Sequence, residues 1–325
     1  MRLWDVADGH AGGVPQSRLM RNQMRRAGAV MCDRAMSNVL SVPGVDELGV
    51  VVDALREWQY EGAPIQLHPG DLGWFWSAGP QATAAAVRTW SGGGRLLAVG
   101  MLDGPDLLRL TIAPDARRDE GLAQQLAEDL TRPERGVLKA GEAYVESPQD
   151  ALLHDLLLEH DWHVDEPWTP LHRDLTEPVG DPGAGLRIEV TGPERAHVRT
   201  AVHRSAFNSP AFTDERWHAM TAGPMYADAR CLVAYDEQDS AVAAVTVWSA
   251  GPGKPGVLEP MGVHQDHRGH GYGRAITVAA AAALQEMGAS SAMVNAPSSN
   301  VAAVATYASA GFTKLPEVRD RRRDA

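Results

Sequence analysis

The stretch that decides the fold runs from His264 to Arg274 and reads His-Gln-Asp-His-Arg-Gly-His-Gly-Tyr-Gly-Arg. It follows an apolar run at 256–263, which predicts a strand, and precedes an alanine-rich segment at 275–287, which predicts a helix. Its three alternating glycines let the backbone approach a ligand closely and adopt positive φ angles. The first N–H groups of a helix lack internal partners, and with the helix dipole they favour an anion. The stretch therefore predicts an anion-binding turn between a strand and a helix.

A glycine-rich turn has other interpretations, and its position in the chain separates them. One alternative is a flexible connection, and another is a dinucleotide-binding loop. A dinucleotide loop usually follows the first strand of a parallel unit, with an acidic residue about twenty positions on. Here the preceding strand is the fourth of its domain, after a hairpin predicted at 231–235 and 241–248. That order disfavours the dinucleotide interpretation.

The bulk composition is that of a folded protein of two-domain size. The 325 residues carry 30 Lys and Arg against 42 Asp and Glu, a formal net charge of −12. This excess of acid argues against a general nucleic-acid-binding protein and is compatible with a cationic small molecule. No apolar run approaches the ~20 residues of a membrane helix, and no signal-peptide pattern is present. We therefore expect a cytoplasmic protein that binds neither nucleic acid nor membrane.

Cysteine and histidine give no metal or redox pattern. The two cysteines, Cys32 and Cys231, lie in different halves, which leaves no disulfide framework or zinc motif. Cys231 stands in the apolar run 231–235 and is predicted to be a small core residue. The three histidines of the glycine stretch have no convincing ligand spacing. No metal site is predicted.

Composition and periodicity divide the chain into five segments. The first is rich in Met, Arg and Gly without a sustained period, so we expect it to be poorly ordered or partly helical. Met31 and Met36 are alternative start positions, which leaves open whether residues 1–35 belong to the native protein. Pro, Gly and Asp dominate the middle segment and predict a linker. The segments are an N-terminal extension (1–44), a first domain (45–175), a linker (176–186), a second domain (187–318) and a charged tail (319–325).

The two domains share one order of predicted elements: hairpin, strand, turn, helix, strand, helix, strand. In the first domain the strand at 107–112 precedes a helix at 121–130, and in the second the strand at 256–263 precedes the helix at 275–287. A repeat of this size indicates a duplication.

Two motifs make the second domain resemble the GNAT superfamily of acetyl-CoA-dependent N-acetyltransferases over roughly 187–318. The family's pyrophosphate signature, Arg/Gln-x-x-Gly-x-Gly/Ala, is matched by Arg268, Gly271 and Gly273. Its second signature, Asn-x-x-Ala-x-x-x-Tyr-x-x-x-Gly-Phe, is matched by Asn300, Ala303, Tyr307, Gly311 and Phe312. The resemblance, to the tandem two-domain type, implies an α/β fold of two GNAT-type domains. Each would have a mixed, mostly antiparallel sheet flanked by helices, with splayed strands holding coenzyme A.

The resemblance implies direct transfer of an acetyl group from acetyl-CoA to an amine of a small molecule. Backbone groups of Met261, Gly262 and Val263 would pair with the pantetheine arm, and Asn300 would order the cofactor cleft and cap the following helix. The glycine stretch would hold the pyrophosphate; its residues are Arg268, Gly269, His270, Gly271, Tyr272, Gly273 and Arg274.

Two residues are candidates for the proton transfers of this reaction. An alkyl ammonium, with a pKa of ~10, must lose a proton before it attacks, and the departing thiolate gains one. Tyr307 matches the family's tyrosine near the sulfur and is the candidate general acid; a core tyrosine is the alternative. Glu259 lies in the strand before the glycine stretch and is the candidate base; a structural salt bridge is the alternative.

The first domain resembles a degenerate copy. Its corresponding turn, at 112–123, keeps Gly121 and Ala123 but places Asp119 and Glu120 where phosphates would bind, and like charges there are unfavourable. The later segment has no matching tyrosine. We therefore expect the second domain to be the active one.

Two other functions stay open on the sequence alone: a non-catalytic acyl-CoA-binding or regulatory module, and a protein N-acetyltransferase. The identity of the acceptor, any ligand of the first domain, the general base and the oligomeric state are not determined by any motif.

Overall fold

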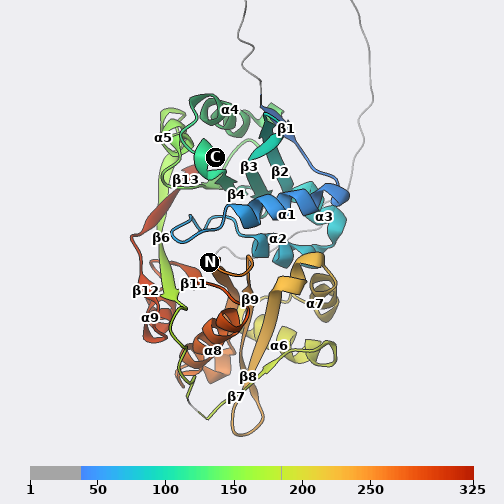
Figure 1. The fold of residues 1–325 in the computed structure, drawn as a ribbon, viewed down its shortest axis with the longest axis vertical. Helices are drawn as coiled ribbons and strands as arrows, with labels where there is room; N and C mark the ends of the chain where they lie inside the picture. Colours follow the sequence, from blue (N-terminus) through green and yellow to red (C-terminus); the bar gives the residue numbers. More distant parts are fainter. Residues whose placement is uncertain (1–37, 184) are drawn as a thin grey trace, which may run out of the picture.

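The computed structural model describes residues 38–183 and 185–325 (Figure 1). The expected poor order of the extension and the alternative starts at Met31 and Met36 therefore concern residues outside the described ranges. The end of the predicted extension is part of the fold, because strand β1 (Val39–Ser41) pairs with the strand at 87–92. The first folded unit thus begins before Val45.

The fold is α/β with a mixed, mostly antiparallel sheet flanked by helices, as the sequence predicted. The described strands form one 13-stranded sheet in the order β1-β2-β3-β4-β5-β13-β6-β11-β10-β9-β8-β7, with β12 paired to β6. The further strands are β2 (Val87–Gly92), β3 (Arg95–Leu102), β4 (Leu107–Ile112), β5 (Ala143–Glu146), β6 (His163–Asp174), β7 (Arg187–Val190), β8 (Ala229–Tyr235), β9 (Ala241–Trp248), β10 (Gly256–Val263), β11 (Ser291–Pro297), β12 (Thr313–Lys314) and β13 (Val318–Arg323). The helices are α1 (Leu48–Glu57), α2 (Pro69–Phe75), α3 (Pro80–Ala86), α4 (Glu120–Thr131), α5 (Leu152–Glu159), α6 (Ala196–Phe207), α7 (Asp214–Thr221), α8 (Tyr272–Glu286) and α9 (Val301–Ser309).

The repeat predicted from the element order is visible in the pairing. In each half an antiparallel strand pair, β3–β4 or β9–β10, leads through a helix to a parallel partner. The parallel pairs are β4–β5 and β10–β11, crossed by α4 and α8 respectively. Helix α8 buries small alanines against the sheet and ends at Glu286, with Met287 as its C-cap, and the following Gly288 has a φ of +83°, the usual helix stop.

The two halves exchange strands. Strand β6 follows the first half along the chain, but its whole second part pairs with β11 of the second half. Strand β13, the last of the chain, pairs with β5 and with the beginning of β6. Figure 1 shows the green β6 running from one half into the other, and the dark red β13 among the elements of the first half.

This exchange corrects the predicted charged tail at 319–325. Its arginines are compatible with a strand because their guanidinium groups bind main-chain carbonyl groups while their stems pack, a habit of long basic side chains. Arg321 Nε donates to the carbonyl oxygen of His154 at 2.9 Å, and Arg323 Nε donates to that of Gly141 at 2.9 Å. The end of the chain is therefore part of the first half's sheet.

Helix α2 of the first half packs directly on Trp248 of β9 in the second. A Cβ atom at Gly70 would lie 2.4 Å from Trp248 Cγ, and one at Gly73 would lie 2.3 Å from Trp248 Cζ3. The two glycines are three positions apart and thus share a helix face, so they form a flat surface for the indole. Their missing side chains allow the close approach of the two halves.

Candidate active site

The glycine stretch forms an open turn at the start of α8. Gly269 and Gly271 have φ angles of +85° and +82°, and a Cβ atom at either would meet nothing within 4 Å. Gly271 is the N-cap of α8 and provides no side-chain hydrogen bond to the first turn. No side chain thus caps the first N–H groups of this 15-residue helix, and there is space beside the two glycines that precede it, an arrangement that suits a phosphate.

Beside this turn, the pairing of β10 with β11 is short. The two strands are in register only at Gly256 and Val257. Further on, Met261, Gly262 and Val263 pair with β9 on their other side. In the described residues the edge of β10 that faces β11 is thus unpaired next to the glycine turn. This separation of the two strands matches the splayed strands that the family resemblance implied.

The two arginines of the turn bind main-chain carbonyl groups in this structure. Arg268 Nη2 donates to the carbonyl oxygen of Ala206 at 2.8 Å, and Arg274 Nε donates to that of Ser309 at 3.1 Å. The ring of His270 stacks on Tyr272 with centroids 5.6 Å apart. The two arginines therefore hold the conformation of the turn and also give it positive charge.

The residues of this turn fit a pyrophosphate group. The glycines leave room for it, the helix start offers unpaired donors, and Arg268 and Arg274 supply positive charge nearby. Gly273 has a different role, because a Cβ there would lie 3.0 Å from Thr306 Cγ2. It lets α8 and α9 approach each other.

The second signature places Tyr307 on α9. Asn300 caps α9 with Oδ1 accepting from the N–H of Ala303 at 3.1 Å, as predicted. Tyr307 is buried on this helix, and burial together with the nearby charge of Glu259 raises the pKa of its hydroxyl. The hydroxyl therefore holds its proton at neutral pH, and the two predicted proton-transfer residues are close enough to interact electrostatically.

Glu259 lies in a bulge of β10, between Leu258 and Met261. Trp248 Nε1 donates to its carbonyl oxygen at 2.8 Å, which fixes the backbone. Its carboxylate accepts from Arg109 Nη2 of β4 at 3.4 Å. The ion pair offered as the alternative for Glu259 is therefore present, and it comes from the other half of the protein.

Sequence reasoning missed Arg109 and the acids around it. Arg109 contacts Asp71 at 2.7 Å, Asp103 at 3.3 Å and Glu146 at 3.4 Å in addition to Glu259. These residues come from α2, the β3–β4 turn and the end of β5. No motif links them, and only the pairing of the two halves brings them together.

Burial raises the pKa values of these acids. It raises the pKa of Asp71 to about 7 and that of Glu146 to about 8, and it also raises that of Asp103, while Arg109 opposes each shift. Asp320 on β13 belongs to the same group, since its charge acts on Glu146. We call Asp71, Asp103, Glu146, Glu259 and Asp320 the acidic cluster.

The corresponding turn of the first half is closed by its own side chain. Asp119 caps α4, and its Oδ1 accepts from the N–H of Leu122 at 2.7 Å. A carboxylate of the protein thus occupies the helix start that Gly271 leaves open in the second half. This supports the interpretation of the first half as a degenerate copy.

The first half has no tyrosine at the position equivalent to Tyr307. The N–H of Phe312 donates to the carbonyl of Tyr307 at 3.2 Å, and the N–H of Trp162 donates to that of Leu157 at the same distance. Leu157 therefore stands where Tyr307 stands, and it has no proton to give.

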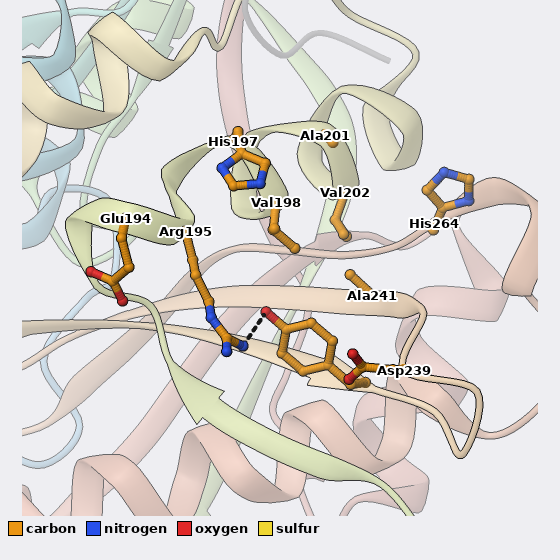
Figure 2. Close-up of a pocket in the computed structure, with 10 residues that line it drawn as sticks. Glu194, Arg195, His197, Val198, Ala201, Val202, Asp239, Ala241 and His264 are labelled. Atoms are coloured by element: carbon orange, nitrogen blue, oxygen red, sulfur yellow. Dashed lines mark hydrogen bonds between the residues drawn. The ribbon is translucent and has the colours of Figure 1, made fainter.

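A cavity of about 690 Å³ lies between α6 and the β8–β9 hairpin (Figure 2). Arg195 crosses it and contacts the hydroxyl of Tyr235 at 3.3 Å, while His264 stands at its rim beside the start of the glycine turn. None of the predicted site residues lines this cavity.

No described helix is long and apolar enough to span a membrane.

Comparison with known proteins agrees with this geometry. Residues 198–312 match the family described as Acetyltransferase (GNAT) family. The second half of the chain therefore contains a GNAT acetyltransferase domain, a class whose general chemistry is acetyl transfer. A search of curated proteins gives no match.

Three solved structures share the fold over nearly their whole length. A GCN5-related N-acetyltransferase from Sphaerobacter thermophilus is 18% identical, with 88% of this chain and 95% of that chain covered and a TM-score of 0.55. A GNAT-family acetyltransferase from Colwellia psychrerythraea is 14% identical, with 88% and 100% covered and a TM-score of 0.56. A tandem GNAT protein from the clavulanic acid biosynthesis pathway is 15% identical, with 88% and 98% covered and a TM-score of 0.58. The tandem arrangement of the two halves is thus a known form of this fold.

Proposed function

We propose that the chain transfers an acetyl group from acetyl-CoA to an amine of a small molecule, with the chemistry in the second half. One observation carries this proposal: the open start of α8 adjoins the unpaired edge of β10, next to Glu259 and Tyr307. Acetyl-CoA supplies the acetyl group as an activated thioester.

The binding roles follow from the geometry of the turn and the strand. The N–H groups at the start of α8 and the loop 268–274 hold the pyrophosphate. Met261, Gly262 and Val263 present main-chain groups to the pantetheine arm along the free edge of β10. Asn300 keeps α9 and its tyrosine in place through its cap.

The chemical roles fall to two side chains. The carboxylate of Glu259 accepts the proton that the acceptor's ammonium must lose before its nitrogen attacks. The hydroxyl of Tyr307, kept protonated by burial, gives its proton to the leaving sulfur. The new bond joins the acceptor's nitrogen to the acetyl carbon, and the bond from that carbon to sulfur breaks.

A library of small amines incubated with acetyl-CoA tests this function, with free thiol as the readout. We expect thiol release to depend on the amine and to fall to background without one. Binding of acetyl-CoA without thiol release on any amine would instead indicate the non-catalytic module. Release only with peptides that carry free N-termini would favour protein acetylation.

A further inference from the structure

The acidic cluster is gathered from five elements around one arginine. Its members come from α2, the β3–β4 turn, β5, β10 and β13, so both halves and the exchanged strand contribute. If all five carboxylates are ionised, the sum with Arg109 is −5 + 1 = −4. Within the described ranges, no other basic side chain lies at ion-pair distance from these acids. Because the pKa values of Asp71, Asp320 and Glu146 are raised to about 7, 7 and 8, these carboxyl groups are partly protonated at neutral pH, and a bound cation would favour their ionised forms.

One oxygen deep in the cluster has no partner. Asp320, whose exposed fraction is 6%, accepts a hydrogen bond from the main chain of Ser147, the residue after Glu146. Its Oδ1 atom is buried and accepts no hydrogen bond from any residue that the structure describes. Burying a polar atom without a partner costs free energy, so Asp320 Oδ1 is an acceptor available to a ligand's donor.

The exposure of the acids around Arg109 is uneven, and Glu259, the candidate base, is the most exposed of them. The exposed fraction of the side chain is 36% for Glu259, 19% for Glu146, 10% for Asp103 and 7% for Asp71. Glu259 is thus the member most accessible from solvent, and it is also the member whose charge acts on Tyr307. A molecule held at Glu259 for reaction therefore lies beside the other acids that Arg109 contacts.

Resting on the function proposed above, we propose that the acceptor is a diamine or polyamine whose second, non-reacting ammonium group is bound by Glu146, Asp103 and Asp320. The reacting nitrogen must be neutral when it attacks, so it cannot offset the charge of the cluster. A second ammonium stays charged and supplies both the missing cation and donors for unpaired oxygens. Among the described residues no group of acids and histidines has the arrangement of a metal site, which favours an organic cation.

The test compares three acceptors with four-carbon chains, and one longer polyamine, with acetyl-CoA and the intact chain. The four are 1,4-diaminobutane, spermidine, n-butylamine and 4-aminobutanoate, with kcat/KM measured from free thiol. We expect kcat/KM for 1,4-diaminobutane and for spermidine to exceed that for n-butylamine by about tenfold or more, as for one partly buried charge pair, and 4-aminobutanoate to be the poorest acceptor. Equal values for n-butylamine and 1,4-diaminobutane would overturn the proposal.

A binding measurement keeps this proposal separate from the proposed function. Thermal unfolding is followed with spermidine or n-butylamine, without acetyl-CoA. Spermidine should raise Tm at concentrations where n-butylamine does not. If no amine is acetylated in the thiol-release assay, the proposed function fails. The thermal-unfolding measurement then still decides whether the acidic cluster binds a polyamine. No stabilisation by spermidine would reject the cluster as its site.

Two variants locate the effect. Glu146→Gln removes a carboxyl that can ionise beside the bound ammonium, with little change of shape, and the preference for 1,4-diaminobutane over n-butylamine should shrink by about tenfold. Glu286→Gln is the matched control, because Glu286 is an exposed acid paired with Arg230 at 2.7 Å outside the cluster. A preference that survives Glu146→Gln, in protein with a cooperative unfolding transition, would contradict the assignment.

Discussion

Arg109 and Glu259 stand on equivalent strands of the two halves, β4 and β10, and their side chains meet with Nη2 and Oε1 at 3.4 Å. The half that has lost its own anion-binding turn therefore contacts the candidate base of the other half. Arg109 also forms ion pairs with Asp71 and Glu146, so it lies between the candidate base and the other acids of the cluster.

Glu259→Gln tests whether this carboxylate is a base or only an ion-pair partner. Gln keeps the size but cannot accept the proton, so turnover should fall by about 10²-fold, within the range for one acid–base group. Turnover is measured by thiol release, and acetyl-CoA binding by calorimetry should survive. Full turnover with a lower Tm would leave Glu259 with the ion-pair role alone.

Tyr307→Phe removes the proposed acid while the ring remains in the core. We expect turnover to fall by about 10²–10³-fold, with acetyl-CoA affinity retained. We expect the loss to be in the chemical step, because the raised pKa of Tyr307 keeps its hydroxyl protonated and able to give a proton to the leaving sulfur. Unchanged turnover would exclude Tyr307 from the mechanism.

Gly271→Glu should abolish acetyl-CoA binding. The change brings a carboxylate to the open start of α8, as Asp119 does at α4. Gly271→Ala separates the backbone strain of a positive φ, which costs about 1 kcal/mol, from the effect of charge. Gly121→Glu in the first half is the matched control, and calorimetric titration should be normal for it. Normal binding by Gly271→Glu would refute the assignment of the turn.

Gly73→Ala should destabilise the protein although alanine favours helices. The added Cβ would lie 2.3 Å from a buried indole that is also held by its bond to Glu259, and such overpacking typically costs about 1–3 kcal/mol. Gly49→Ala in α1 is the control, because its Cβ would meet nothing within 4 Å, and it should stabilise by about 0.5–1 kcal/mol. Denaturant unfolding measures both. Equal effects would show that α2 does not need the close contact with Trp248.

Stability should decrease as the pH rises from about 7 to 9. The pKa values of Asp71, Asp320 and Glu146 are raised to about 7, 7 and 8, mainly by burial, so these groups bind more protons in the folded than in the unfolded chain. Their contribution is complete below the unfolded pKa of ~4 and is lost as the pH rises through the folded values. The pKa values of His68 and His154 are lowered to about 4, so these two groups make stability rise with pH, but only below about pH 6.5.

Thermal unfolding across this pH range checks the sign. Glu146→Gln should flatten the dependence, because it removes the group with the highest of these values. The exposed Glu286→Gln should leave the slope as it is. A Tm that rises between pH 7 and 9 would contradict the burial of these carboxyl groups.

The sequence alone determined the local parts of this protein. Each of these parts is encoded within one short segment, because helix ends and turns depend on neighbouring residues. They are the glycine turn, the Asn300 cap, Tyr307, and the equivalent turn of the first half that Asp119 closes. Their order along the chain was enough to predict the repeat and the class of fold.

Only the tertiary structure decided how the two halves combine. The exchange of β6 and β13 corrected the predicted tail, since a charged segment can pair as a strand when carbonyl groups elsewhere receive its arginines. The acidic cluster around Arg109 joins residues up to about 250 positions apart, and no spacing in the sequence records a contact that arises from packing one domain on another.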